Sequence, residues 1–217
     1  MASPRLFWWA AFAFALVAAA GLLGLDSAVL RWTAALPDDD TLWDRGTALL
    51  DLVTLKGLST YWLGMILLAA AGLLLAIRAT RNAGWLTLYV GAVQLVTATV
   101  AENAKPPFGR LRPFQAGGID TWYAGSDSFP SGHAASYAGL FLPLMLLVPR
   151  LTPLWAIPTL FIALARIFDH VHYLSDVSAS LALAAGFTAA FAPIALRASA
   201  TPARTQEPRR AGPAPDR

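Results

Sequence analysis

The stretch "LFWWAAFAFALVAAAGLLGL", residues 6–25, contains no charged or hydrogen-bonding side chain apart from its two tryptophans. Roughly 20 apolar residues in a helix are enough to cross the hydrocarbon core of a bilayer. The stretch therefore predicts a membrane-spanning helix. Arg5 before it and the alanines 18–20 within it also fit a cleaved signal peptide, but the apolar run is long for one.

Five more apolar segments follow, at residues 60–77, 83–101, 134–148, 154–168 and 177–196. The chain is 57% apolar, and it has no cysteine that could form a disulfide or bind a metal. Soluble domains are roughly 45–50% apolar, even when glycine is counted. We therefore expect an all-α polytopic membrane protein with six transmembrane helices.

The domain organisation follows from the same pattern. Residues 1–197 form one six-span domain, and the Pro/Ala/Arg-rich segment 198–217 is expected to be a disordered cytoplasmic tail. Two connections are long: residues 26–59 are acidic, with a short surface helix expected over 28–36, and residues 105–129 are polar and rich in Gly and Pro.

The charges indicate an orientation. With a cytoplasmic N-terminus, the inner segments hold nine of the 16 basic residues and only two of the 13 acids. This bias fits the positive-inside rule and predicts an inner-membrane protein with both termini cytoplasmic. The net charge of +3 then reflects topology and contact with membrane lipids, so no nucleic-acid partner is expected.

Three polar stretches stand out at the ends of the outer loops: "KPPFGRLRP" at 105–113, "FPSGHAAS" at 129–136 and "ARIFDHVHYLSD" at 165–176. A single cation or histidine at a span end is usually interfacial. Uncompensated cations gathered beside a bilayer, however, should cost on the order of several kcal/mol per buried ion. A bound polyanion would offset that cost.

Phosphate is the anion that these residue types suit. Arg112 and Arg166 can each hold two phosphoryl oxygens, and Lys105 adds a point charge. Ser131 and Gly132 open a helix, so their N–H groups and the helix dipole point at an anion.

The histidines supply the chemistry. One of them can attack phosphorus while the other protonates the leaving oxygen. Asp176, four residues after His172, can reach its Nδ1–H and fix the tautomer. No carboxylate cluster for metal ions is visible, so we expect a mechanism without metal or other cofactor.

Together, Lys-x6-Arg-Pro, Pro-Ser-Gly-His and Arg-x5-His-x3-Asp resemble the motifs of the type-2 phosphatidic acid phosphatase superfamily, which includes lipid phosphatases and soluble vanadium haloperoxidases. The resemblance extends over about residues 6–196 and implies a haloperoxidase-like helical core with an extracytoplasmic site. It implies a phosphohistidine on His172, with Asp176 as partner and His133 as general acid. The phosphate ligands that it implies are Lys105, Arg112, Ser131, Gly132 and Arg166.

Some residues depart from the family pattern or lie beside it. Ala165 stands where the family usually has Ser, which removes one hydroxyl contact. Asp169 and His170 form either a solvated loop pair or a substrate-selecting contact. Glu102 is expected to pair with Lys105 or Arg110.

The function expected is hydrolysis of a lipid-linked phosphate or diphosphate at the membrane. Undecaprenyl diphosphate ranks first, phosphatidate or phosphatidylglycerol phosphate second and a lipid A phosphate third. The alternatives are a small-molecule phosphatase of the glucose-6-phosphatase kind and a transporter. A transporter needs polar groups at mid-span, where Gln94 is nearly alone.

Overall fold

The structure is a computed structural model that describes residues 1–36, 40–57, 59–116 and 120–200. These residues form nine α-helices and contain no strand, so the all-α prediction is confirmed. The helices are α1 (Pro4–Ala20), α2 (Asp26–Ala34), α3 (Asp40–Thr54), α4 (Trp62–Ala76), α5 (Arg81–Phe108), α6 (Gly132–Leu147), α7 (Thr152–Phe168), α8 (Leu174–Ala190) and α9 (Ala192–Ala200). Short helical turns η1 (Gly21–Leu25), η2 (Arg78–Thr80) and η3 (Pro149–Leu151) link some of them.

The apolar helices fall on the six predicted segments. Three helical stretches are long and apolar enough to cross a membrane: Pro4–Ala34, Arg78–Phe108 and Pro149–Phe168. Helices α8 and α9, bent by 41°, can form a fourth span, while α4 and α6 are shorter apolar helices. Large apolar side chains face outward, with Trp9 70% and Leu23 88% exposed. The chain is thus a helical membrane protein, and the count of six spans stays a prediction.

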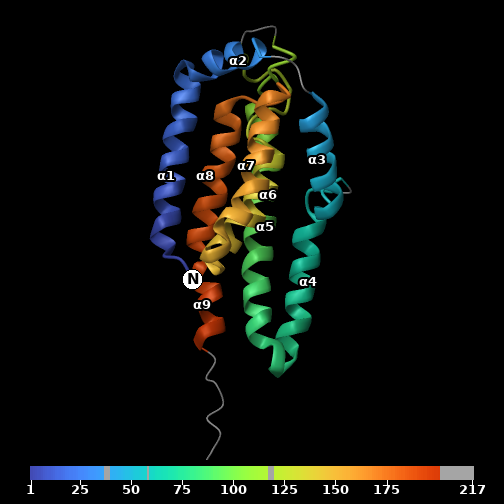
Figure 1. Cartoon of the computed structure of the whole chain (residues 1–217), viewed down its shortest axis with the longest axis vertical. Helices are drawn as coiled ribbons and strands as arrows, with labels where there is room; N and C mark the ends of the chain where they lie inside the picture. Colours follow the sequence, from blue (N-terminus) through green and yellow to red (C-terminus); the bar gives the residue numbers. More distant parts are fainter. Residues whose placement is uncertain (37–39, 58, 117–119, 201–217) are drawn as a thin grey trace, which may run out of the picture.

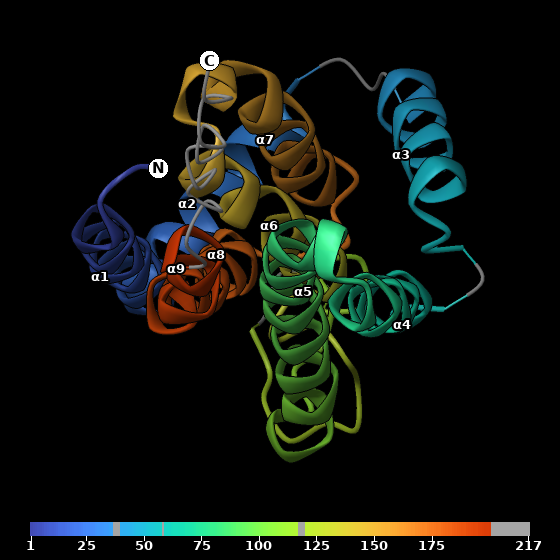
Figure 2. The same cartoon turned by 90° about the horizontal axis from the view of Figure 1, so that it is seen from below.

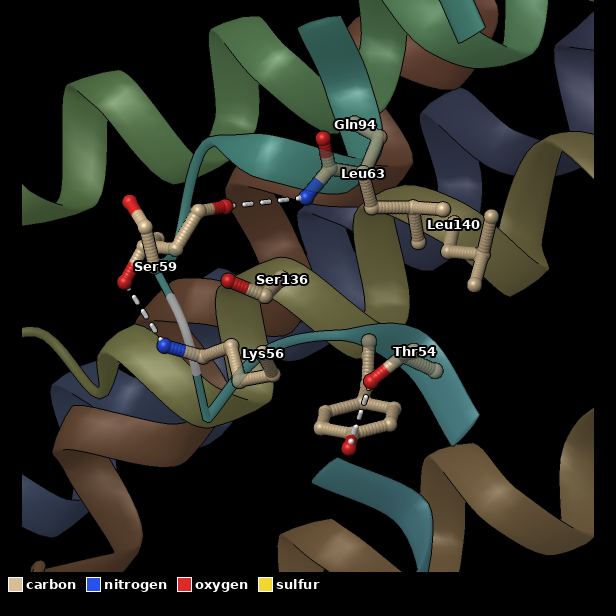
Figure 3. A pocket seen from close by; sticks show the side chains of 9 residues that line it. Thr54, Lys56, Ser59, Leu63, Gln94, Ser136 and Leu140 are labelled. Atoms are coloured by element: carbon tan, nitrogen blue, oxygen red, sulfur yellow. Dashed lines mark hydrogen bonds between the residues drawn. The ribbon is translucent and has the colours of Figure 1, made fainter. Parts of the chain in front are cut away.

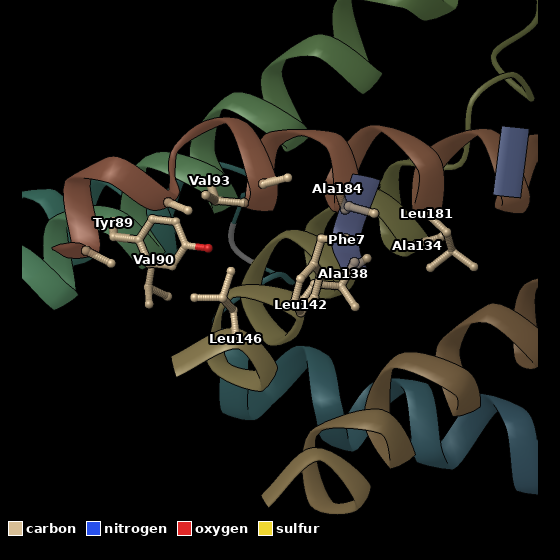
Figure 4. Packing of buried hydrophobic residues seen from close by; sticks show 14 of the residues in the cluster. Phe7, Tyr89, Val90, Val93, Ala134, Ala138, Leu142, Leu146, Leu181 and Ala184 are labelled. Atoms are coloured by element: carbon tan, nitrogen blue, oxygen red, sulfur yellow. The ribbon is translucent and has the colours of Figure 1, made fainter. Parts of the chain in front are cut away.

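Helices α5, α6 and α8 form the centre of the bundle (Figures 1 and 2). Around them, α1 packs on α8, α4 on α5 and α7 on α6. Figure 4 shows the core between the central helices, where Tyr89 and Val93 of α5 lie near Leu142 and Leu146 of α6. A Cβ on Gly139 would lie 3.1 Å from a backbone atom of α5, so this glycine lets α5 and α6 approach closely.

Helix α2 lies across one end of the bundle, because the chain turns sharply after α1 (Figure 1). Gly24 makes the turn with a φ of 129°, which favours glycine. The helix expected over 28–36 is therefore present, starting at Asp26. Asp26 is 5% exposed and points into the same end of the bundle as the polar motifs.

The two long connections contain more helix than expected. Helix α3 was not predicted, because its acids interrupt the apolar pattern; Trp43 on it stacks on Phe168 of α7. Helix α5 continues through Pro106 and Pro107, so the loop expected from residue 105 begins at Gly109. Proline tolerates helical φ, and Gly109 then ends the helix in the left-handed region.

The two ends of the bundle differ in charge. In Figure 1, α2 and the segment after α5 lie at one end, while the N-terminus, η2 and α9 lie at the other. Arg78 of η2 and Arg197 of α9 therefore belong to the end opposite the motifs. Helix α9 reaches Ala200, and the rest of the predicted tail lies outside the described residues.

Candidate active site

The site is built around the N-terminus of α6. The Ser131 side chain caps the helix by accepting from the N–H of Ala134 at 3.4 Å. The backbone N–H of Ser131 donates to the carbonyl of Asp176 at 3.2 Å, and Ser180 Oγ donates to the Ser131 carbonyl at 2.9 Å. These bonds tie the N-terminus of α6 to the first turns of α8.

Gly132 lets a second helix approach this N-terminus. A Cβ at Gly132 would lie 2.1 Å from Glu102 Oε1 and 3.1 Å from Lys105 Nζ. Any other residue would therefore force the ends of the Glu102 and Lys105 side chains to move. The glycine brings the predicted cation Lys105 over the α6 N-terminus.

His172 and Asp176 form the predicted pair. His172 Nδ1 lies 3.4 Å from Asp176 Oδ2, longer than the roughly 2.7–3.2 Å of a standard hydrogen bond. The same oxygen accepts from Ser128 Oγ at 2.6 Å and from the Tyr173 N–H at 2.9 Å. Burial lowers the pKa of His172; Asp176 raises it, and Arg112 and Lys105 lower it. The imidazole is consequently neutral near pH 7, as a nucleophile must be.

Arg110 anchors Asp176, a role that the sequence analysis missed. Its guanidinium is fully buried and donates to Asp176 Oδ1, to Ser175 Oγ at 2.7 Å and to Asp26 Oδ2 at 2.7 Å. It also forms a bidentate bond to Asp120, at 2.8 and 2.7 Å. Burial lowers the pKa of Arg110, but these carboxylates raise it above its usual value. No local pattern marks this role, because the partners come from three distant segments.

The other cations of the site are already paired, which corrects the expectation of uncompensated charge. Lys105 Nζ lies 2.7 Å from Glu102, as predicted for that glutamate. Arg112 forms two bonds to Asp127, at 2.8 and 2.9 Å, and this pairing holds the pKa of Asp127 below its usual value. A phosphate that enters the site must compete with these carboxylates.

Arg166, in the last turn of α7, donates to Asp169 at 2.8 Å and to Thr47 of α3 at 3.3 Å. The Asp169 side chain is only 9% exposed, so the interpretation as a solvated loop pair is wrong for this residue. His170 Nε2 lies 3.1 Å from Thr33 Oγ1 of α2, which joins the loop to the helix across the bundle end.

His133, the second residue of α6, contacts α3. Its Nε2 lies 3.2 Å from Asp51 Oδ2. Lys56, in the segment after α3, is close enough to act electrostatically on this pair and on Lys105, and its Nζ donates to Thr60 at 2.7 Å (Figure 3). Asp51 and Lys56 were not predicted, since their segment was taken for a surface connection.

The site is rich in cations and offers no obvious metal cage. Within the described residues, no three His, Asp or Glu side chains converge as a metal site. The groups gathered at the α6 N-terminus, at His172 and around Arg166 are those that suit an anion.

The comparisons with known proteins agree with this geometry. A family model described as the PAP2 superfamily matches residues 82–199, which include all three motifs. The chain belongs to the PAP2 superfamily. This membership confirms the resemblance drawn from the motifs.

Two curated relatives are each called lipid A 1-phosphatase, from Rhizobium etli and Rhizobium johnstonii. Each is 29% identical over 111 residues. The match covers 48% of this PAP2 chain and 48% and 46% of the relatives. The chain therefore spans about half the length of the curated relatives that it matches.

A solved structure shows that the PAP2 fold extends beyond the family match. It is the crystal structure of a transmembrane PAP2-type phosphatidylglycerolphosphate phosphatase from Bacillus subtilis. The similarity covers 91% of this chain and 98% of that one, with a TM-score of 0.56 at 18% identity. At this identity the likeness concerns the fold alone.

Proposed function

We propose that this chain is a membrane phosphatase that hydrolyses a lipid-linked phosphate or diphosphate through a phosphohistidine on His172. The observation that carries the proposal is the pair of His172 and Asp176 beside the cationic α6 N-terminus. Asp176 orients Nδ1, so Nε2 is the nitrogen left for attack.

In the first step, His172 Nε2 forms a bond to phosphorus while the bond from phosphorus to the leaving oxygen breaks. His133 gives its proton to that oxygen. Asp176 stabilises the charge that develops on the His172 ring, as the aspartate of a catalytic triad does. The product left on the protein is a phosphohistidine.

In the second step, a water oxygen attacks phosphorus and the bond to Nε2 breaks. His133 now acts as a base and accepts a proton from the water. The phosphoryl oxygens are held by Lys105, Arg112, Arg166 and the N–H groups at Ser131 and Gly132. For these contacts to form, Glu102, Asp127 and Asp169 must release their cations to the phosphate.

An apolar groove supports a lipid as the substrate. It has a volume of about 930 Å³ and lies between α1, α5 and α8, with Trp8, Ala15 and Leu183 among its lining residues. Phe129 and Pro130 also line it, directly before Ser131. A chain of methylene or prenyl units could lie in this groove while its phosphate reaches the α6 N-terminus.

Three lipid phosphates are candidate substrates. The site has little soluble extension for recognising a large headgroup, which favours a simple one. Undecaprenyl diphosphate ranks first because the resemblance implies that bacterial members of this size often recycle this lipid carrier. The names of the two curated relatives favour a lipid A 1-phosphate, and that of the solved structure a phosphatidylglycerol phosphate. All three belong in the same experiment.

The test is phosphate release by the purified protein in mixed micelles. Undecaprenyl diphosphate, lipid A, phosphatidylglycerol phosphate and phosphatidate are compared at equal surface concentration, with glucose 6-phosphate as the soluble control. We expect at least one lipid to give a kcat/KM well above that of glucose 6-phosphate, and activity to survive EDTA. Equal values for the sugar phosphate and every lipid would contradict a lipid phosphatase.

A further inference from the structure

A second histidine–aspartate pair lies in the site, between helices that are far apart in the sequence. His133 Nε2 of α6 is 3.2 Å from Asp51 Oδ2 of α3. The two side chains are 29% and 21% exposed, so water screens them only partly. An ionised carboxylate has no proton to donate, and Nε2 must therefore carry the hydrogen.

Asp51 is itself held in place. Its Oδ1 accepts from the hydroxyl of Tyr137 at 2.8 Å, and Tyr137 lies one turn after His133 on α6. The Tyr137 hydroxyl is also 3.0 Å from Thr54 Oγ1, which donates to the Leu50 carbonyl at 2.8 Å. Two helices thus fix the carboxylate against the imidazole.

We propose that Asp51 is a positioning residue for His133: it accepts the Nε2–H and leaves Nδ1 to exchange a proton with the leaving oxygen. The proposal rests on the proposed function, in which His133 is the general acid. It gives the acid the same kind of support that Asp176 gives the nucleophile, by holding one tautomer and stabilising the imidazolium.

The charges around His133 make this support necessary. Burial disfavours an imidazolium at His133 most, and Lys56, from the segment after α3, and Arg166 of α7 disfavour it as well. Tyr137, one turn further along the same helix, contributes a neutral hydroxyl. Asp51 is the carboxylate that opposes these cations. Without it, His133 would lose its proton at lower pH and could no longer act as an acid.

The test compares a poor and a good leaving group on the full chain in detergent. General acid catalysis contributes roughly 10²–10⁴-fold, and least when the leaving group needs no proton. We expect Asp51→Asn to lower kcat/KM on phosphatidate, which reports only the steps up to formation of the phosphohistidine, by about 10- to 100-fold. On p-nitrophenyl phosphate the loss should be within about threefold, and the alkaline limb of the phosphatidate pH profile should move to lower pH.

The variant His133→Ala separates this proposal from the function on which it rests. If Asp51 acts through His133, adding Asp51→Asn to His133→Ala should cause no further loss. Equal losses on both substrates, or losses that multiply in the double variant, would overturn the role of Asp51 while leaving the phosphatase intact. Unchanged phosphatidate turnover in His133→Ala would overturn both the general acid and the positioning role.

Two further variants guard against a folding defect. Tyr137→Phe keeps every charge but removes the hydroxyl that holds Asp51, so it should show the same leaving-group dependence with a smaller loss. Asp44→Asn changes an exposed aspartate on the same helix and should leave both activities unchanged. A loss in Asp44→Asn as large as in Asp51→Asn would contradict the proposal.

Discussion

At the scale of single residues, His172 is both buried and surrounded by cations. Burial, Arg112 and Lys105 lower its pKa, and Asp176 opposes them. The neutral imidazole is the proposed nucleophile, so a lowered pKa should keep the protein active at lower pH. The cations proposed to bind the phosphate therefore also favour the neutral form of His172.

This balance predicts a pH effect. The acid limb of kcat/KM should lie below pH 6.5, the ordinary pKa of histidine. In Asp176→Asn the carboxylate that raises this pKa is gone, so the limb should move to still lower pH, while the maximum falls on the order of 10³-fold. The ionisation of the substrate is the same for both proteins and cancels in the comparison. A limb that moves to higher pH would contradict the assignment.

The nucleophile itself gives a simpler prediction. His172→Ala removes the nitrogen that forms the phosphohistidine, so turnover should fall by at least ~10³-fold. Trapping with radiolabelled substrate should show acid-labile label on the wild type and none on the variant. Near-normal turnover in a folded His172→Ala preparation would exclude the phosphohistidine.

Arg110 supports the site in a different way, through stability. Removing this buried cation leaves the carboxylates of Asp26 and Asp176 buried without their counter-ion, which typically costs about 3–5 kcal/mol. Arg110→Met should therefore lower both activity and the thermal unfolding temperature in detergent. Arg112→Met is the control: its partner Asp127 is 54% exposed, so activity should fall with little change in unfolding temperature. Equal unfolding temperatures for the two variants would contradict this role of Arg110.

At the scale of helices, the groove between α1, α5 and α8 should hold the lipid tail. Ala15 of α1 lines the groove, whereas Ala13, on the same helix and also exposed, does not. Ala15→Trp should raise the KM for long-chain phosphatidate several-fold and leave p-nitrophenyl phosphate unaffected. Ala13→Trp should change neither the KM for phosphatidate nor the activity on p-nitrophenyl phosphate. If both variants act alike on the lipid, the tail lies elsewhere.

The helices also show what a sequence can predict. The apolar segments 6–25 and 83–101 are recognisable because a bilayer demands long runs of apolar side chains. Helix α3 was not predicted, because its acidic residues are typical of a surface loop. The contact between Asp51 and His133 becomes visible only in the structure. The motif residues were found from spacing and chemical type, whereas the roles of Arg110 and Lys56 depend on contacts between distant segments. Such contacts leave no periodicity in the chain.

At the scale of the whole molecule, the two ends of the bundle contain different kinds of residues. One end contains the motif residues, α2 and the segment after α5, and the other contains η2, η3 and α9 with their arginines. Arginine near a span end is retained on the cytoplasmic side during insertion. The proposed site would then face the extracytoplasmic side, where it meets phosphate groups of the outer leaflet.

This polarity predicts the result of reporter fusions. A phosphatase or fluorescent reporter joined after Arg197 should read as cytoplasmic. One inserted at Gly117-Gly118, which lie outside the described residues, should read as external.

Replacing Arg78 and Arg81 by glutamate should weaken this orientation bias, because it removes two of the basic residues that hold η2 on the cytoplasmic side. As the control, Arg31→Gln and Ser27→Ala change two exposed residues of α2 and should leave the orientation unchanged. A reversed pattern in the unmodified chain would place the histidines on the cytoplasmic side. The substrate would then have to be a phosphate of the inner leaflet.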